Sequence, residues 1–308
     1  MKEGSVSSPP AVRCSALTKD YGSGRGVFDL DLTVEVGEVF GFIGPNGAGK
    51  TTTIRLLMDL IRPDRGAATV FGLDCREDSL AVKRLVGYLP GEMASFPGVT
   101  AGYVVGLLAG LRGSVDMARV SALAETLDLD LSSRYEDLSH GNRQKVGLIQ
   151  AFMHHPKLLI LDEPTLGLDP LMQRRFRQLV TESVEAGATV FLSSHVLSEV
   201  EQICNRIALI RNGRLVRVGT LDELRELRLH QVSAIFEGSL QATDVESLPG
   251  VSDVRVEDHR LTCSVRGPVS PLLQALVDAR VVEVDSRELT LEEIFISEYE
   301  TAPTRADR

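Results

Sequence analysis

The sequence predicts an α/β fold with a largely parallel central sheet. Short apolar segments, suited to strands buried on both faces, alternate along the chain with segments of helical length. One of them, Val39–Ile43, leads directly into a glycine-rich loop and then into an expected helix at Lys50–Leu60. Such alternation is typical of parallel strands that are joined by helices.

The expected elements of this first domain follow in chain order. Residues Val27–Val36 alternate apolar and polar side chains, which is the period of a half-buried strand. After Val39–Ile43 we expect strands at Ala68–Phe71, Leu158–Leu161, Thr189–Leu192 and Ile207–Ile210. The helices expected between them are Lys50–Leu60, Asp116–Leu127, Met172–Glu185 and Leu197–Cys204.

Two regions depart from this alternation. Between residues 93 and 151 helical periodicity dominates, so we expect a helical subdomain inserted into the domain that spans residues 1–229. Residues 230–300 are expected to form a second, small α+β domain, and residues 301–308 a disordered tail. The expected elements of the small domain are strands Val232–Phe236, Val251–Val256, Leu261–Val265 and Val281–Val284 and a helix at Pro271–Ala279.

Charge and cysteine content exclude several classes of function. The chain has a net charge of −10, and residues 230–308 hold 15 acidic against 7 basic side chains. An acidic chain without a basic block is a poor partner for nucleic acid, and we expect no nucleic-acid partner. The N-terminal segment lacks an apolar signal core, and the cysteines follow no metal-binding or redox spacing. We therefore expect buried thiols in a reducing compartment at Cys14, Cys75, Cys204 and Cys263.

One segment needs comparison with a membrane span. Residues Met93–Leu111 carry no charge over 19 residues, which is close to spanning length. Only Tyr103–Leu111 is a compact apolar run, so we expect a soluble helix there. Glycine recurs on it at every fourth position, at Gly102, Gly106 and Gly110. Tight packing within the helical subdomain is the favoured explanation, and close approach by a partner is the alternative.

The segment GPNGAGKTT, Gly44–Thr52, fits the phosphate-binding P-loop pattern between a strand and a helix. Its glycines let backbone N–H groups turn towards an anion, and the start of the helix adds positive charge. Lys50 can neutralise phosphate charge, and the Thr51 hydroxyl can ligate Mg²⁺. The residues expected to contact a nucleotide here are Gly44, Asn46, Gly47, Gly49, Lys50, Thr51 and Thr52.

Two carboxylates end the apolar strand in LLILDEP, Leu158–Pro164. Consecutive residues of a strand point to opposite sides, so the two acids cannot share one task. We expect Asp162 to face Mg²⁺ and Glu163 to act as the general base for an attacking water. His195 follows another apolar strand, where local pattern alone favours a helix cap or a locally bonded loop residue. Ser139 precedes a helix-like run as an N-cap.

With these motifs in this order, residues Val12–Leu229 resemble the ATPase subunits of ABC transporters. The resemblance implies a P-loop NTPase core of RecA-like type with a helical subdomain. Five ordered segments carry the resemblance: Gly44–Thr52 as Walker A, Leu138–Asn142 as the signature, Leu158–Pro164 as Walker B, Gly167–Pro170 as the D-loop and His195 as the switch histidine.

The resemblance implies ATP hydrolysis in a homodimer of ATPase subunits with composite ATP sites. Glu163 would be the catalytic base, His195 would contact the γ-phosphate and Asp169 would couple the two sites. Tyr21 stands where the family stacks an aromatic ring on adenine, and a core tyrosine at a strand end is the alternative. The signature residues that would reach the partner's ATP are Ser139, Gly141 and Asn142.

Three positions depart from the family pattern. His140 replaces a signature glycine, and Asn142 replaces its glutamine. The His140 ring either points away from the phosphate or adds a titratable contact near it. Gly91 stands where the glutamine of the family's Q-loop is expected. Glu92 follows it and is expected to act as the Mg²⁺ ligand instead, with an exposed loop acid as the alternative.

The resemblance also implies a separate membrane-spanning permease, and hence a cytoplasmic subunit attached to the inner face of the membrane. Residues Phe96–Tyr103 are expected to form part of the docking groove for that permease. The Q-loop segment and the C-terminal extension are similar to those of bacterial exporters for drugs, antibiotics or lipids. An importer ATPase, or a non-transport ABC ATPase of ribosomes or DNA repair, is the alternative.

Overall fold

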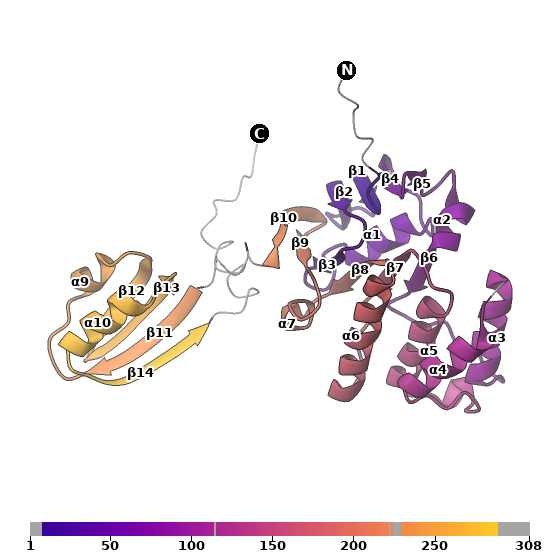
Figure 1. Cartoon of the computed structure of the whole chain (residues 1–308). Helices are drawn as coiled ribbons and strands as arrows, with labels where there is room; N and C mark the ends of the chain where they lie inside the picture. Colours follow the sequence, from indigo (N-terminus) through magenta and orange to yellow (C-terminus); the bar gives the residue numbers. More distant parts are fainter. Residues whose placement is uncertain (1–7, 114, 222, 224–228, 289–308) are drawn as a thin grey trace, which may run out of the picture. The chain divides into compact units, whose positions relative to one another are not determined.

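The computed structural model describes residues 8–113, 115–221, 223 and 229–288. The chain divides into two compact units, Met1–Gly219 and Thr220–Arg308 (Figure 1). Each unit has its own hydrophobic core. The division falls after Gly219, about ten residues before the boundary expected from the sequence, and the first described strand of the second unit, β11, begins at Leu229. The expected tail at residues 301–308 lies outside the described residues.

A six-stranded sheet forms the centre of the first unit. Its order is β10-β9-β3-β8-β7-β6, and the neighbours from β9 to β6 are parallel. Every residue of β3, β7 and β8 is buried, as expected for continuous apolar runs. The strands β6 and β10 were not predicted. The bounds are β3 Val39–Ile43, β6 Val86–Leu89, β7 Leu158–Asp162, β8 Thr189–Ser194, β9 Arg206–Arg211 and β10 Arg214–Thr220.

A second, antiparallel sheet packs against the same core in the order β2-β1-β4-β5. The strand expected at Ala68–Phe71 belongs to this sheet as β4, not to the parallel one, because it pairs antiparallel with β1. Helix α1 lies between the two sheets and contributes Ile54 and Leu57 to their shared core (Figure 1). The bounds are β1 Val12–Asp20, β2 Gly26–Val34, β4 Arg65–Val70, β5 Leu73–Asp74 and α1 Lys50–Leu57.

The helical region expected between residues 93 and 151 is present as α3, α4 and α5, which group beside α6 (Figure 1). Three helices are shorter than predicted, and α4 lacks only the first and last residues of its expected range. Helix α1 ends before Asp59, which has a positive φ of 50°, and α7 ends at Val200. The helices are α2 Ser79–Leu85, α3 Ala101–Arg112, α4 Met117–Thr126, α5 His140–Phe152, α6 Pro170–Glu185 and α7 Leu197–Val200, with a 3-10 turn at Tyr135–Asp137.

Among the described residues, no helix has the length and apolar character needed to cross a membrane. The glycine stripe of α3 is only partly packed. A Cβ atom added at Gly102 would lie 3.0 Å from the carbonyl oxygen of Leu131, whereas one added at Gly106 or Gly110 would meet no atom within 4 Å. The expectation of tight internal packing is therefore wrong for Gly106 and Gly110.

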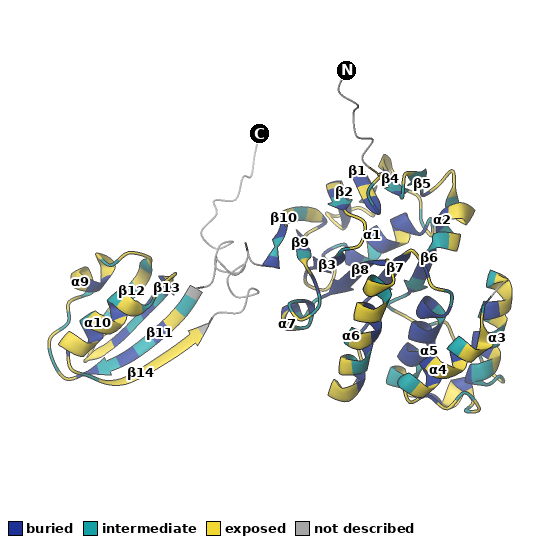
Figure 2. Cartoon of the chain, viewed as in Figure 1, coloured by how far each residue is buried: buried dark blue, intermediate teal, exposed yellow. Residues whose placement is uncertain are grey.

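The second unit is the expected small α+β domain. Its antiparallel sheet has the order β12-β13-β11-β14, and buried residues alternate along β13 (Figure 2). Helix α9 was not predicted. The elements are β11 Leu229–Phe236, α9 Ala242–Glu246, β12 Val251–Glu257, β13 Arg260–Arg266, α10 Ser270–Asp278 and β14 Val281–Glu288. All four cysteines of the chain are free and buried, as predicted, and burial raises the pKa of Cys263 to about 11.

Candidate functional site

The glycine-rich loop joins the end of β3 to the start of α1. Gly47 and Gly49 have φ angles of 81° and 112°, a backbone region in which a side chain is strained. A Cβ atom at Gly49 would also lie 3.0 Å from the carbonyl oxygen of Gly26. The first turn of α1 contains no acidic residue. The loop and the helix start therefore present backbone N–H groups and positive dipole to an anion.

Lys50 is the first residue of α1 and is only 5% exposed. Its Nζ donates to the carbonyl oxygen of Gly44 at 2.6 Å and to that of Pro45 at 3.3 Å. The same Nζ lies 3.2 Å from Oε1 of Glu163. The structure thus brings the lysine of the phosphate loop against the acid expected to serve as base.

Glu163 follows the last residue of β7 and has a positive φ of 50°. Its backbone N–H donates to Oγ of Ser193 at 3.1 Å, and its Oε2 lies 2.9 Å from Nδ1 of His195. The carboxylate is therefore placed between an ammonium and an imidazole. His195 is not the locally bonded loop residue that its sequence pattern favours, because its ring contacts a side chain 32 positions away.

Asp162 is fully buried at the end of β7. Its Oδ1 accepts from Oγ of Ser193 at 2.6 Å, while its Oδ2 is buried without a hydrogen-bond partner among the described residues. Burial and the Asp162 carboxylate raise the pKa of Tyr88 to about 12. Ser193 hydrogen-bonds to both Asp162 and Glu163, and the sequence pattern does not predict it as a site residue. The only signal in the sequence is its place at the end of a strand, two residues before His195.

An orphaned buried carboxylate oxygen is a free ligand position for a hard cation. Among the described residues, no group of three or more His, Cys, Asp or Glu could hold a metal ion by itself. The orphaned oxygen of Asp162 fits Mg²⁺, which proteins bind through one or two carboxylates together with substrate phosphates and water.

Gly91 lies beside this carboxylate. A Cβ atom added at Gly91 would be 3.0 Å from Oδ2 of Asp162. Glu92, the expected substitute ligand, is an exposed residue of the following bend. The position that lacks the Q-loop side chain is therefore the one that faces the orphaned oxygen.

The expected signature residues stand at the start of α5. Ser139 is its N-cap, and its hydroxyl accepts from the N–H of Asn142 at 3.2 Å. Gly141 contacts the D-loop of the same chain, since an added Cβ atom would lie 2.5 Å from the carbonyl oxygen of Gly167. Asp169 caps α6 by accepting from the N–H groups of Leu171 and Met172. Both motifs thus expose the N-terminus of a helix.

Tyr21 lies in the loop between β1 and β2 and is 48% exposed, so it is not a core tyrosine. Its N–H donates to the carbonyl of Arg25, next to Gly26, whose carbonyl adjoins Gly49 of the phosphate loop. The loop that carries this aromatic ring therefore leads to the glycine-rich loop.

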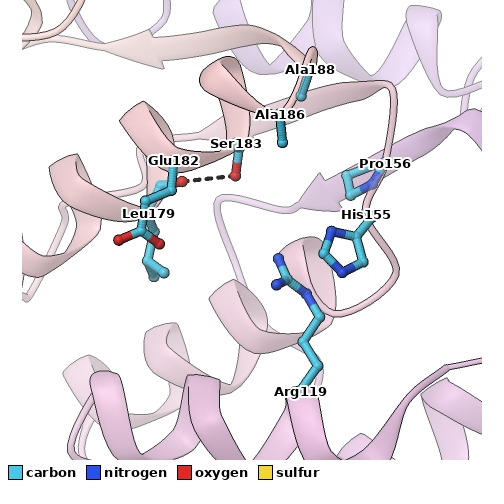
Figure 3. A pocket seen from close by; sticks show the side chains of 8 residues that line it. All are labelled: Arg119, His155, Pro156, Leu179, Glu182, Ser183, Ala186 and Ala188. Atoms are coloured by element: carbon cyan, nitrogen blue, oxygen red, sulfur yellow. Dashed lines mark hydrogen bonds between the residues drawn. The ribbon is translucent and has the colours of Figure 1, made fainter.

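A separate cleft lies between α4, the turn after α5 and the end of α6 (Figure 3). No predicted site residue lines it, so it is distinct from the phosphate loop. Its lining residues are Arg119, His155, Pro156, Leu179, Glu182, Ser183, Ala186 and Ala188.

Known proteins show the same architecture. The ABC transporter family model matches residues 27–166. The chain is 39% identical over 231 residues to an uncharacterized ABC transporter ATP-binding protein of Nostoc sp., covering 70% of this chain and 68% of the relative. It is 35% identical to the bacitracin transport ATP-binding protein BcrA of Enterococcus faecalis, covering 79% and 80% of the two chains.

Solved structures agree. The structure of an ATP-binding subunit of an ABC transporter superposes with a TM-score of 0.65 at 32% identity, over 70% of this chain and 92% of that one. An ABC cassette bound to ADP and phosphate, at 23% identity and a TM-score of 0.61, shares the fold. With its P-loop, its paired acids and these relatives, the chain belongs to the family of ABC transporter ATP-binding proteins, which bind and hydrolyse ATP.

Proposed function

We propose that this chain is the ATP-hydrolysing subunit of an exporter and drives its substrate through a separate membrane-spanning permease. The single observation that carries the proposal is the Glu163 carboxylate, 3.2 Å from Nζ of Lys50 and 2.9 Å from Nδ1 of His195. An acid held against the lysine of a phosphate loop can accept a proton from water that attacks a γ-phosphate.

The three side chains divide the chemistry. Lys50 can exchange its pairing with Glu163 for phosphate oxygens, since an ammonium pairs with either anion. Glu163 is then left as the base for the attacking water. His195 bonds Glu163 through Nδ1, so its Nε2 is free to face the γ-phosphate. The backbone N–H groups of Gly47 and Gly49 and the residues Gly44, Asn46 and Thr52 complete the phosphate site, and Tyr21 stacks on adenine.

Mg²⁺ is the proposed metal, and it would supply charge neutralisation at the phosphate oxygens. The Thr51 hydroxyl and Oδ2 of Asp162 would hold it, and Oγ of Ser193 fixes the Asp162 carboxylate by donating to Oδ1. Glu92 is proposed as the further acidic ligand, supported by the place of its neighbour Gly91 beside Oδ2 of Asp162.

We propose a homodimer in which the signature of each subunit completes the ATP site of the other. Ser139, Gly141 and Asn142 stand at the exposed start of α5, where a helix N-terminus attracts phosphate. Asp169, exposed at the start of α6, then lies at the same interface and couples the two sites. These placements support composite sites.

Export is favoured by the relatives that carry a named activity. They include the daunorubicin/doxorubicin resistance ATP-binding protein DrrA of Streptomyces peucetius, 35% identical over 81% of this chain, and the bacitracin protein BcrA. By analogy, the permease places this subunit at the cytoplasmic face of the membrane. The sequence has no basic block, so its charge does not support the alternative of a nucleic-acid partner.

The permease contact is proposed at Phe96–Tyr103. The Phe96 ring packs edge-on against Tyr135 at 5.2 Å between ring centroids, while the Tyr103 side chain at the start of α3 is 60% exposed. The exposed Tyr103 ring supports the proposal, because aromatic side chains are enriched at protein interfaces.

The test is co-purification with a candidate multi-span membrane protein that is co-expressed with this chain, followed by transport in inside-out vesicles. Substrate-stimulated ATPase with uptake into such vesicles supports export, whereas release from them means import. Replacing Phe96 and Val99 with Asp, or Tyr103 with Asp, should remove the permease and leave nucleotide binding unchanged. Met117→Asp is the control, since Met117 is an apolar residue on α4 that is 51% exposed. Unchanged co-purification of the Asp variants would exclude this docking surface.

A further inference from the structure

The helix that begins with the signature is bonded to the candidate base of its own chain. Gln144 lies one turn into α5 and is 2% exposed. Its Nε2 donates to the backbone carbonyl of Glu163 at 3.0 Å. The backbone N–H of Glu163 donates to Oγ of Ser193. Both backbone polar groups of Glu163 are therefore held by side chains from other elements.

These bonds hold a backbone conformation that is unfavourable by itself. The φ angle of Glu163 is 50°, in a region that few residues other than glycine adopt. The Glu163 carbonyl also accepts from the N–H of Leu166 at 3.2 Å, so Gln144 adds a second donor to a turn that is already formed. Because φ and ψ aim the side chain, the Gln144 bond helps to set where the Glu163 carboxylate lies.

A second contact joins the same two segments. A Cβ atom at Gly141 would lie 2.5 Å from the carbonyl oxygen of Gly167, and one at Gly167 would lie 2.6 Å from Cδ2 of His140. Residues 140–141 of the signature thus press on the D-loop that follows Glu163. A shift of the start of α5 must move this loop, because there is no space between them.

We propose that Gln144 is a positioning residue that couples the signature of a subunit to the catalytic base of the same subunit. The proposal rests on the proposed function, in which Ser139 binds the partner's ATP and Glu163 serves the subunit's own. Engagement of Ser139 by the partner's phosphate moves α5, and Gln144 transmits that movement to Glu163. Each ATP site therefore senses occupation of the other through a bond inside one chain.

The test is a double-mutant cycle on ATPase turnover of the full chain. Gln144→Met keeps nearly the same shape but has no donor, and Ser139→Ala removes the hydroxyl that reaches the partner's ATP. Gln150→Met is the matched control, since Gln150 lies on the same helix and donates to the carbonyl of Tyr88, on β6, at 3.4 Å. Gln144→Leu serves if Gln144→Met does not fold.

We expect Gln144→Met to lower kcat by about tenfold with KM for ATP changed less than about twofold, because one bond to the carbonyl of the base is lost. The effects of Gln144→Met and Ser139→Ala on kcat should be non-additive in the double variant. The effects of Gln150→Met and Ser139→Ala should be additive. Additive effects of Gln144→Met, or a kcat equal to that of Gln150→Met, would overturn the proposal. If the wild-type chain hydrolyses no ATP, the proposed function fails instead.

Discussion

Nζ of Lys50 lies 3.2 Å from Oε1 of Glu163, and this ion pair joins the glycine-rich loop to the end of β7. The two side chains are only 6% and 16% exposed. Removing one partner of a largely buried pair leaves the other charge without compensation. Substitution of Glu163 alone can therefore show whether hydrolysis depends on its carboxylate while Lys50 still binds phosphate.

Glu163→Gln removes the base but keeps the shape of the side chain and the hydrogen-bonding position beside His195. We expect ATP to bind with unchanged affinity and kcat to fall by about 100-fold or more, which is the usual contribution of a general base. Phosphate release and equilibrium binding of a fluorescent nucleotide measure the two quantities. Glu182→Gln, on the exposed face of α6, should turn over like wild type. Wild-type turnover in Glu163→Gln would remove Glu163 from the role of base.

Asp162→Asn tests the metal site. The substitution removes the negative charge whose Oδ2 is buried without a protein partner. We expect the apparent affinity for Mg²⁺ in ATP hydrolysis to weaken by about tenfold or more, because the hard cation loses an anionic ligand. Titration of ATPase activity with Mg²⁺ at saturating ATP measures the effect. An unchanged titration curve would show that the orphaned oxygen does not face the cation.

Gly91→Ala tests the crowding at the same oxygen. The new Cβ atom would lie 3.0 Å from Oδ2 of Asp162, so the carboxylate must move by a few tenths of an ångström. We expect a several-fold loss of Mg²⁺ affinity with little change in folding. Gly110→Ala is the matched control, because its Cβ atom meets no atom within 4 Å. Equal Mg²⁺ titrations for the two variants would contradict this expectation.

The sequence predicts the strands of the core well where the local pattern carries the information. Continuous apolar runs mark β3, β7, β8 and β9 because a strand covered on both faces needs no polar side chain. The same pattern cannot name a strand's partner, and the run at Ala68–Phe71 was placed in the wrong sheet for that reason.

The candidate site was predictable to the extent that its order of motifs is visible along the chain. The motifs name Lys50, Asp162 and Glu163, and the structure brings Nζ of Lys50 within 3.2 Å of Oε1 of Glu163. The contacts of His195 and of Gln144 were not predictable, because they join residues 32 and 19 positions apart through side-chain geometry. Only the folded chain reveals that Gly91 lies beside Oδ2 of Asp162.

His140→Gly tests whether the signature histidine titrates at the phosphate. In the structure its Cδ2 lies against Gly167 of its own chain, 2.6 Å from where a Cβ atom at Gly167 would be. We therefore expect His140→Gly to change the ATPase rate by the same factor at pH 6 and at pH 8, since packing on the D-loop does not depend on charge. If the ATPase rate of His140→Gly varied less between pH 6 and pH 8 than that of wild type, the ring would instead lie near the phosphate.

His154, at the turn after α5, links stability to pH. Its Nε2 lies 3.3 Å from the carbonyl oxygen of Val86, and its Nδ1 is buried without a partner among the described residues. Burial, with the nearby charge of Arg112, lowers the pKa of His154 from 6.5 to about 4. Between these values the unfolded chain binds a proton that the folded chain does not, so stability falls as pH drops from about 6.5 towards 4.

His154→Gln should remove this dependence, because the amide can still reach the carbonyl of Val86 and does not titrate. The ring is half-buried, so solvent screening reduces the effect. Between pH 7 and pH 4.5 we expect the free energy of unfolding to fall by about 1–2 kcal/mol more in wild type than in the variant. Urea unfolding at the two pH values measures the difference. His155→Gln, the exposed neighbour, should behave like wild type. Equal losses in wild type and His154→Gln would show that another group carries the acid sensitivity.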